Sequence, residues 1–357
     1  MADRHFRHRL DISASTGAGP AGLGGAEHGT ARWGRQEAAM ADIGRAGLSR
    51  RRVLTAGALA GATLLGTGLT GGKASAASAP AIFYSPHQDD EVLGLAGSIL
   101  EHKAAGRPVY LVLVTLGEND GLARIMNEKD EEGEKMECEL RKKNHCAAHG
   151  PHGLDWPTDG VGMIVPSRTA EFMASAAVLG VDKVINLKIS DSAWNGDDAF
   201  EKFTKTVKSK IASIADQYPG ASHKFTAGWL EVSATHKAIS DAAVQLARAG
   251  KLTDVRFNFV YAYDYPLASR GNGAAYVLNI PAAHMQTKLN AIACYNTWKP
   301  SKNLYALGYH SASEKLEGAA ADPHEYVFAV PNDDYEYGDI GFKKGGKYSG
   351  KPQWGWS

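Results

Sequence analysis

The sequence has little of what would mark several large classes of protein. Its 357 residues contain three cysteines and no CxxC pair, too few and too odd in number for a disulfide scaffold. Lysine plus arginine equals aspartate plus glutamate at 39 each, so no net charge draws the chain to nucleic acid or to an anionic surface. Beyond residues 53–72, no apolar run is long enough to span a membrane. We therefore expect neither nucleic-acid binding nor stable membrane insertion of the processed chain.

The region before residue 80 carries an export signal. Residues 49–54 read SRRRVL, a twin-arginine pattern, and an uncharged stretch of small residues follows up to Gly72. The A-x-A sequence at 74–76 matches a cleavage site. A membrane anchor is the alternative, but the many glycines of this stretch would make a poor spanning helix. Residues 40–79 are thus predicted to be a twin-arginine signal peptide, and the protein to be secreted or extracytoplasmic.

Residues 1–39 precede this signal and are rich in Gly, Ala, Arg and His without an apolar period, which predicts a disordered extension. A start at Met40 would place a short basic segment before the twin arginines, as such signals usually have. We therefore expect Met40 to be the physiological start, with residues 1–39 not translated.

From Ala81 onward the apolar pattern alternates between the two regular periods. Apolar runs predict strands at 81–85, 109–115, 184–187, 225–229 and 256–263. Helical spacing predicts helices at 92–100, 131–148, 168–179, 198–217 and 236–249. This order is typical of an α/β fold: a Rossmann-like, doubly wound, mostly parallel sheet with helices on both faces. We expect a single domain at 80–357, with an insertion at 119–166 and an irregular C-terminal extension from about 265.

Metal-binding side chains follow the first predicted strand directly, where residues 86–91 read PHQDDE. Zinc takes imidazole nitrogen and carboxylate oxygen, and a catalytic site keeps one position open for water. His87 and one aspartate supply two of three ligands, which leaves the other aspartate as general base for the metal-bound water. The alternative is that the acidic run merely caps the helix that follows.

This segment resembles the H-P/Q-D-D-E signature of the PIG-L (LmbE-like) N-deacetylase family, whose members are zinc hydrolases that act on N-acetylated sugars. The resemblance extends from about Ile82 to Ala249 around the insertion and is that of a secreted, actinobacterial-type member. It implies His87 and Asp90 as metal ligands and Asp89 as the base. Further matches are Thr115, Gly117, Glu118, the R-x-x-E pair Arg168 and Glu171, the LGV turn at 179–181, Leu187 and Asp191.

The family's third ligand is the last histidine of an H-x-D-H motif that opens a helix, and residues 233–236 (SATH) occupy that place. The resemblance implies His236 as this ligand, with a polar surface residue as the alternative. Ser233 stands where the family has a histidine that helps polarise the substrate carbonyl, so another group must stabilise the tetrahedral intermediate. Our candidate is His310, as a catalytic residue, and a loop histidine without a role is the alternative.

Two further sets of residues are predicted to contact the substrate. Glu118, Asn119 and Asp120 follow the second strand on the same edge of the sheet and are candidates for binding sugar hydroxyls, with solvated loop charges as the alternative. An aromatic wall for a sugar face, with simple packing as the alternative, has the candidates Trp194, Trp229, Tyr263 and Tyr265.

The sequence thus predicts a zinc-dependent hydrolase that removes an N-acyl group, specifically N-acetyl, from an amino sugar or a sugar-containing metabolite. Fe²⁺ would accept the same ligands. Two alternatives stay open: a deacylase that removes a longer acyl chain from a glycosylated natural product, and a catalytically silent carbohydrate-binding protein of the same fold. The expected partners are a small-molecule or glycan substrate and the twin-arginine export machinery, with the oligomeric state left open.

Overall fold

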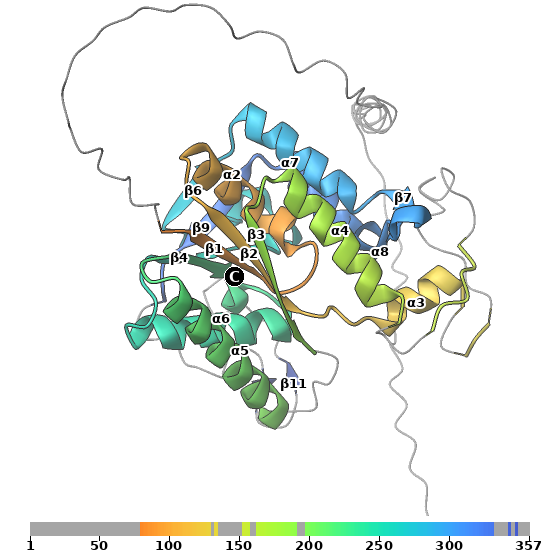
Figure 1. Ribbon diagram of the computed structural model, residues 1–357, viewed down its shortest axis with the longest axis horizontal. Helices are drawn as coiled ribbons and strands as arrows, with labels where there is room; N and C mark the ends of the chain where they lie inside the picture. The colour runs from red at the N-terminus through yellow and green to blue at the C-terminus, as the bar shows by residue number, and fades with distance from the viewer. Residues whose placement is uncertain are drawn as a thin grey trace, which may run out of the picture. The chain divides into compact units, whose positions relative to one another are not determined.

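A seven-stranded sheet organises the chain, in the order β3-β2-β1-β4-β5-β9-β6 (Figure 1). The computed structural model describes residues 79–129, 132–134, 152–157, 162–190 and 197–331, and the backbone of 342–343 and 347–348. The neighbouring strands β3, β2, β1, β4 and β5 are parallel to one another, whereas β9 is antiparallel to both of its neighbours, β5 and β6. The strands are β1 (Ala81–Ser85), β2 (Val109–Thr115), β3 (Lys183–Ile189), β4 (Ser222–Thr226), β5 (Val255–Asn258), β6 (Tyr276–Asn279) and β9 (His324–Phe328).

Helices cover both faces of this sheet. In Figure 1, α5 and α6 lie on one side and α2, α4, α7 and α8 on the other. The helices are α2 (Ala96–Ala104), α3 (Asp120–Asn127), α4 (Ile164–Val178), α5 (Asp197–Gln217), α6 (Ala234–Arg248), α7 (Ala282–Cys294) and α8 (Leu307–Ala321), and a π-helical turn, η1 (Glu91–Leu95), leads into α2. The short elements are η4 (Gly228–Leu230), η5 (Ala262–Asp264), η6 (Leu267–Ser269), η7 (Pro300–Lys302), β7 (Trp298–Lys299), β8 (Leu304–Tyr305), β10 (Phe342–Lys343) and β11 (Lys347–Tyr348).

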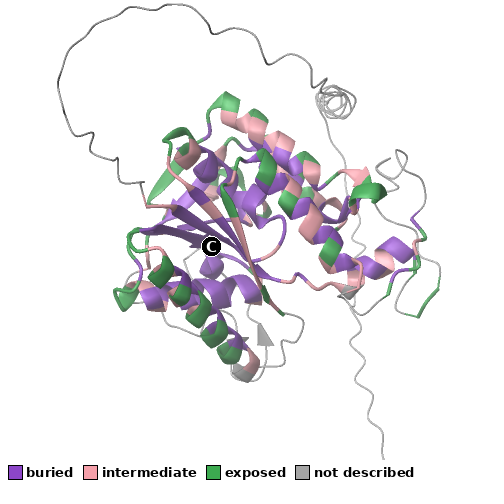
Figure 2. Cartoon of the chain, in the orientation of Figure 1, coloured by how far each residue is buried: buried purple, intermediate pink, exposed green. Residues whose placement is uncertain are grey.

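Strand β1 shows why its sequence is apolar throughout. Successive side chains of a strand point to opposite faces, so Ile82 and Tyr84 pack under α5 and α6 while Phe83 packs under α2 and α4. All of them are fully buried, and Figure 2 shows the central strands as the most buried part of the fold. The predicted α/β sheet with helices on both faces is therefore confirmed.

Some boundaries differ from the predictions, for packing reasons. The strand predicted at 225–229 is β4, which ends at Thr226, and Trp229 lies in η4. There η4 passes so close to the start of α6 that a Cβ atom on residue 228 would lie 2.3 Å from the carbonyl oxygen of His236, which requires Gly228. Likewise the run predicted at 256–263 is β5 only as far as Asn258, and η5 follows.

The C-terminal part of the chain has more regular structure than its sequence pattern indicates. Beyond residue 265 it contributes β6 and β9 to the sheet, with α7 and α8 between them. Most of the helix predicted at 131–148 lies outside the described residues, as does the predicted signal peptide apart from residue 79.

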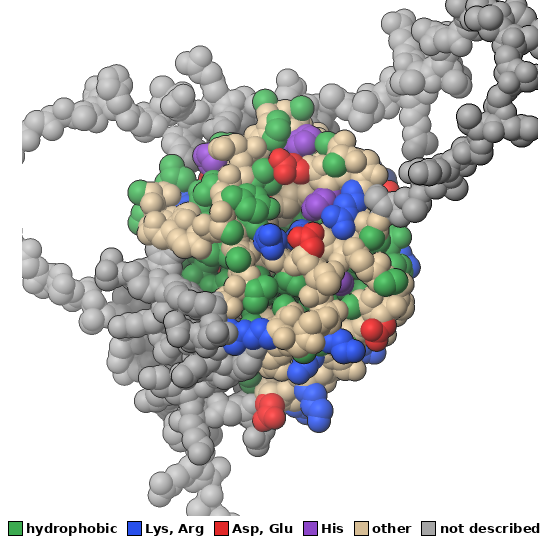
Figure 3. All heavy atoms as spheres, turned by 90° about the vertical axis from the view of Figure 1, so that its left-hand side faces the viewer, with side chains coloured by type: hydrophobic (Ala, Val, Ile, Leu, Met, Phe, Trp, Pro, Cys, Tyr) green, Lys and Arg blue, Asp and Glu red, His purple; other side chains and the backbone are tan. Residues whose placement is uncertain are grey.

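One face of the molecule shows how charged side chains are distributed. The face shown in Figure 3 carries acidic and basic side chains among neutral ones, without a broad patch of one sign. Within the described residues, no helix has the length and apolar character needed to cross a membrane.

Candidate metal centre

The loop after β1 is held in place at the carboxyl edge of the sheet. The backbone nitrogen and the hydroxyl of Thr115, at the end of β2, both donate to the carbonyl oxygen of Pro86, at 3.1 and 2.8 Å. The hydroxyl of Ser85 donates to the carbonyl oxygen of His87 at 2.7 Å. The ends of two neighbouring parallel strands therefore fix the position of the loop that carries His87 and the two aspartates.

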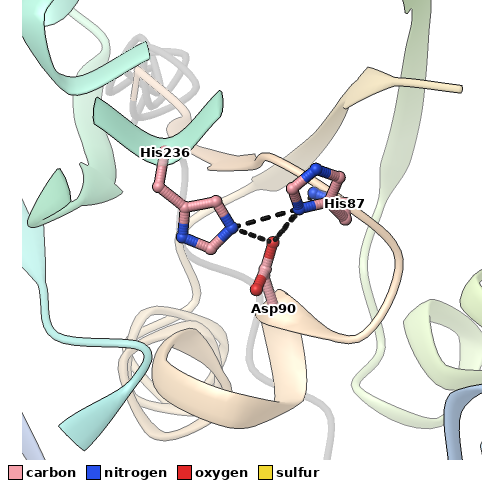
Figure 4. Close-up of side chains that lie close together, drawn as sticks. All are labelled: His87, Asp90 and His236. Atoms are coloured by element: carbon pink, nitrogen blue, oxygen red, sulfur yellow. Dashed lines mark hydrogen bonds and ion pairs between the residues drawn. The ribbon is translucent and has the colours of Figure 1, made fainter. Parts of the chain in front are cut away.

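Three ligand atoms from this loop and from α6 converge (Figure 4). The Nε2 atom of His236 lies 3.1 Å from Asp90 Oδ2 and 3.1 Å from His87 Nδ1. His87 Nδ1 lies 3.4 Å from the same Asp90 oxygen. All three atoms fall within 4.8 Å of one another, and this is the one such group of His, Cys, Asp or Glu side chains among the described residues.

Asp90 does not act as a simple helix cap. Its side chain makes no capping hydrogen bond to η1, and Oδ2 instead accepts from the backbone nitrogen of His87 at 2.8 Å. Its other oxygen, Oδ1, is buried and has no hydrogen-bond partner among the described residues. A buried carboxylate oxygen without a partner is costly unless a cation or another donor satisfies it, which favours the metal-site interpretation of the acidic run.

The charges around His236 favour a positive charge at this point. Burial acts against a charged imidazole, but the carboxylates of Asp90 and Glu231 raise the pKa of His236 to about 10. Burial also opposes ionisation of Asp90, yet His236 and His87 hold the pKa of Asp90 below its usual range. The residues present therefore fit a divalent cation, with the nitrogen and oxygen donors that Zn²⁺ prefers.

His236 takes its place from the first turn of α6. Ser233 is the N-cap residue of this helix, and its hydroxyl accepts from the backbone nitrogen of His236 at 3.4 Å. The serine at the place of the family's first motif histidine thus has a helix-capping role. The predicted start of a helix at the third ligand is confirmed.

Glu231 is a site residue that the sequence reasoning missed. Its Oε2 atom is hydrogen-bonded to Nδ1 of His236, and both side chains are fully buried. Its Oε1 atom accepts from the backbone nitrogen of Val260 at 2.8 Å and from that of Tyr261 at 3.4 Å. Glu231 precedes α6 in no recognisable motif, and only the fold shows that it reaches the ligand.

Asp89 lies beside the three ligand atoms in a constrained backbone conformation. Its φ of 103° is in the region that favours glycine, a strain that is typical of functional sites. Tyr295 stabilises this conformation, because its hydroxyl accepts from the backbone nitrogen of Asp89 at 3.0 Å and donates to Glu91 at 2.5 Å. Ser175 also donates to Glu91, at 2.6 Å. A buried network therefore fixes where Asp89 stands.

Arg168 contacts the Asp89 carboxylate from α4. Its NH2 atom lies 3.5 Å from Asp89 Oδ2 and donates to the carbonyl oxygen of Gln88 at 3.0 Å, while NH1 donates to that of Gly117 at 3.0 Å. Burial raises the pKa of Asp89 to about 7, with Arg168 opposing the rise and Asp90 adding to it. The first residue of the R-x-x-E pair thus connects the two loops that border the site.

Glu171, the second residue of that pair, binds backbone groups at the start of α8 instead of the Asp89 loop. Its carboxylate accepts from the backbone nitrogens of Tyr305, Leu307 and Gly308, at 3.3, 2.7 and 2.9 Å. It therefore anchors the start of α8, the helix that carries His310. One turn of α4 accordingly holds both the Asp89 loop and the α8 terminus.

His310 is placed by contacts of its own. Its Nδ1 atom lies 2.7 Å from the carbonyl oxygen of Ala306, and its Nε2 atom lies 2.9 Å from Nε2 of His152. It does not belong to the group of ligand atoms that His87, Asp90 and His236 form within the described part of the chain. Its catalytic role stays a prediction.

The four predicted substrate-binding residues differ in their surroundings. Glu118 accepts from the hydroxyl of Ser190 at 2.9 Å, and Asn119 caps α3 by accepting from the backbone nitrogen of Leu122 at 3.0 Å. Asp120 is the first residue of α3, and Trp194 lies outside the described residues. Sugar binding by these four residues stays a prediction.

The other aromatic candidates are packed within the fold. Trp229 is buried against Phe257, with ring centroids 4.9 Å apart. The hydroxyl of Tyr263 donates to the carbonyl oxygen of Leu93 at 2.8 Å, and that of Tyr265 donates to Leu230 at 3.3 Å. These contacts favour the packing alternative for this part of the proposed aromatic wall.

The sequence around this site matches a known family. Residues 82–247 fit the model described as PIG-L, GlcNAc-PI de-N-acetylase. This segment is a PIG-L family domain. The PIG-L domain contains His87, Asp89, Asp90 and His236, and its family supports the enzyme class predicted from the sequence, a hydrolytic deacetylase.

Several solved structures resemble the chain at low identity. The A40926 pseudoaglycone deacetylase Dbv21 is 18% identical with a TM-score of 0.44, over 72% of this chain and 100% of its own. A deacetylase–teicoplanin complex is 16% identical with a TM-score of 0.45, over 71% and 100%. The N,N'-diacetylchitobiose deacetylase from Pyrococcus horikoshii is 16% identical with a TM-score of 0.39, over 70% and 83%. No curated protein sequence matches the chain.

Proposed function

We propose that this protein hydrolyses the N-acetyl amide of an amino sugar or a sugar-containing metabolite, with Zn²⁺ held by His87, Asp90 and His236. The observation that carries this proposal is the convergence of the three ligand atoms beside a separate carboxylate, Asp89, that a buried arginine holds in place. The PIG-L domain supports the amide as the bond that is cleaved and an amino sugar as the substrate class.

The residues at the site have separate roles in the proposed reaction. When bound, the cation would supply Lewis-acid polarisation of the amide carbonyl. Asp89 is the general base: its carboxylate takes a proton from the attacking water and returns it to the leaving amine nitrogen. Arg168 holds Oδ2 of Asp89, and Tyr295 holds its backbone, so the carboxylate needs little reorganisation during the reaction.

The distinct placement of the two aspartates explains their distinct roles. Asp90 Oδ2 faces both imidazoles and belongs to the ligand set. Asp89 Oδ2 faces the guanidinium of Arg168 instead. The left-handed backbone at Asp89 turns consecutive side chains in different directions, so neighbouring carboxylates serve as ligand and as base.

The experiment that tests this function is the release of amine and acetate from N-acetylglucosamine derivatives by the purified mature chain. We expect turnover with zinc, loss of turnover with a chelator and recovery when zinc is restored. A parallel series with longer N-acyl chains tests the deacylase alternative, which faster release of a long chain would establish. Binding of the sugars without any amine release would establish the silent-binder alternative and contradict our proposal.

We also propose that the chain is exported by the twin-arginine pathway, on the strength of residues 49–54. The substitutions Arg50→Lys and Arg51→Lys, made together, retain the charge but remove the arginine pair. We expect the wild-type chain in the extracytoplasmic fraction and this variant in the cytoplasm. Unchanged export of the variant would contradict the proposal.

A further inference from the structure

The buried carboxylate of Glu231 contacts the imidazole of His236, the candidate third ligand. Glu231 Oε2 is hydrogen-bonded to Nδ1 of His236, on the side of the imidazole opposite to Nε2, which faces Asp90 and His87. The exposed fraction of both the Glu231 and the His236 side chain is 0%. The contact is therefore shielded from bulk water.

The contact determines which imidazole nitrogen has a lone pair to offer. A neutral imidazole carries one proton, and the hydrogen bond made by one nitrogen sets whether the other is protonated. An ionised carboxylate only accepts hydrogen bonds, so Glu231 requires the proton on Nδ1 of His236. In the neutral form that metal binding requires, Nε2 then presents its lone pair toward His87 and Asp90.

The second oxygen of Glu231 fixes the orientation of the carboxylate. Oε1 accepts from the backbone nitrogens of Val260 and Tyr261, which follow β5. The ring of Tyr261 packs against the imidazole, with its centroid 4.9 Å from that of His236. Glu231 thus connects the start of α6 to the segment after β5 and leaves the imidazole little freedom to rotate.

We propose that Glu231 is a positioning residue of the metal centre, which holds His236 as its Nδ1–H tautomer and thereby makes Nε2 a metal ligand. The inference rests on the proposed function only for the presence of a metal, not for the substrate or the reaction. Carboxylates in this position orient metal-ligating histidines and raise their basicity, and their loss typically weakens metal binding about 10–100-fold.

The variant Glu231→Gln separates this role from a structural one. Its amide oxygen can still accept from Val260 and Tyr261, so the connection to the segment after β5 survives. Its amide nitrogen, however, faces Nδ1 of His236 as a donor, which requires Nδ1 to accept and moves the imidazole proton to Nε2. The substitution therefore keeps the packing while it inverts the tautomer.

Asp241→Asn is the matched control. Asp241 is a buried carboxylate on α6, the helix of His236, and accepts from Gln245 at 3.3 Å without contacting any of the three ligands. Zinc affinity is measured for both variants and the wild type by competition with a chromophoric chelator, and folding by circular dichroism. We expect zinc affinity about 10–100-fold weaker in Glu231→Gln and unchanged in Asp241→Asn.

A second readout covers the case in which Glu231→Gln does not fold. In the zinc-loaded wild type, ¹⁵N NMR of the His236 ring, assigned by comparison with His236→Gln, reports which nitrogen carries the proton. We expect a protonated Nδ1 and a metal-bound Nε2. A folded Glu231→Gln variant with wild-type zinc affinity, or a proton on Nε2 in the loaded wild type, would overturn the assignment.

These readouts are independent of turnover. A wild type that binds zinc through Nε2 of His236 yet releases no amine would contradict the proposed function and leave the role of Glu231 intact. A wild type that binds no zinc or other divalent transition metal would overturn both.

Discussion

Nδ1 of His87 and Nε2 of His236 lie 3.1 Å apart, although 149 positions separate the two residues. The topology explains this proximity. The loop with His87 follows β1, and the segment that leads to His236 follows β4, which pairs in parallel with β1. Parallel neighbours end at the same edge of a sheet, so both segments begin at one place. Neither segment holds three ligands alone, and the site exists only in the folded domain.

The two aspartates are expected to respond differently to substitution. Asp89→Asn removes the general base but no ligand, so it should retain zinc and lose turnover, typically by 10²–10⁴-fold. His87→Ala removes a ligand and should lose both metal and activity. Metal content of the purified variants and amine release measure the two effects. Equal loss of metal in both variants would contradict the assignment of roles.

Arg168→Lys is expected to slow turnover while leaving the metal in place. The guanidinium bonds two carbonyl oxygens and faces Asp89, and a lysine has no fork with which to make these contacts together. Misplacement of the base lowers kcat, by up to about 10²-fold. Arg107→Lys is the control, because the guanidinium of Arg107 donates to the carbonyl oxygens of Ala79 and Pro80. Similar kcat values for both variants would argue against a role of Arg168 in holding Asp89.

Tyr295→Phe is expected to destabilise the fold. The substitution removes a hydroxyl that donates to Glu91 and accepts from the backbone nitrogen of Asp89, and it leaves both of these buried groups with fewer partners. The cost should be about 1–3 kcal/mol in the free energy of unfolding, measured by urea denaturation. Tyr276→Phe is the control, since Tyr276 is 48% exposed. Equal stabilities of the two variants would show that the hydroxyl of Tyr295 contributes little.

The stability of the fold should depend on pH through Asp241, which lies on α6 outside the ligand group. Burial raises the pKa of Asp241 to about 7 from its ordinary value of 3.8, with the hydrogen bond from Gln245 opposing the rise. The folded state therefore binds this proton more tightly than the unfolded state, and stability falls as the pH rises from about 4 to about 7.

Asp241→Asn should remove this contribution. Unfolding free energies at several pH values test the prediction: the wild type should lose stability relative to Asp241→Asn between pH 4 and pH 7, and the difference should level off above that range. A difference that stays constant across the range would show that Asp241 does not titrate in this way.

The part of the site formed by β1 and the loop after it could be predicted from the sequence, because strand and ligands are adjacent in the chain. Strand β1 is buried on both faces and reads as one apolar run, and the metal-binding side chains follow it without a gap. His236 could be assigned as a ligand only through the family resemblance, because a lone histidine in the first turn of a helix does not by itself indicate metal binding. The packing of α4 agrees with the R-x-x-E resemblance, although only the structure shows that Arg168 and Glu171 serve different loops.

The remainder depends on contacts between segments distant in sequence. Glu231 reaches His236 only because η4 turns back over the start of α6, and Gly228 permits that approach. Trp229 is predicted as the end of a strand, but it lies in η4 and packs against Phe257 of the neighbouring strand β5. The strands β6 and β9 are short and lie far apart in the chain, so their pairing at the sheet edge had no periodic signal.

The most direct test of the whole account is a zinc-loaded crystal structure with anomalous diffraction data collected at the zinc edge. We predict one strong anomalous peak, bonded to Nδ1 of His87, Oδ2 of Asp90 and Nε2 of His236, with Asp89 outside the ligand set. A peak elsewhere, or a zinc ion that leaves His236 beyond bonding distance, would contradict it.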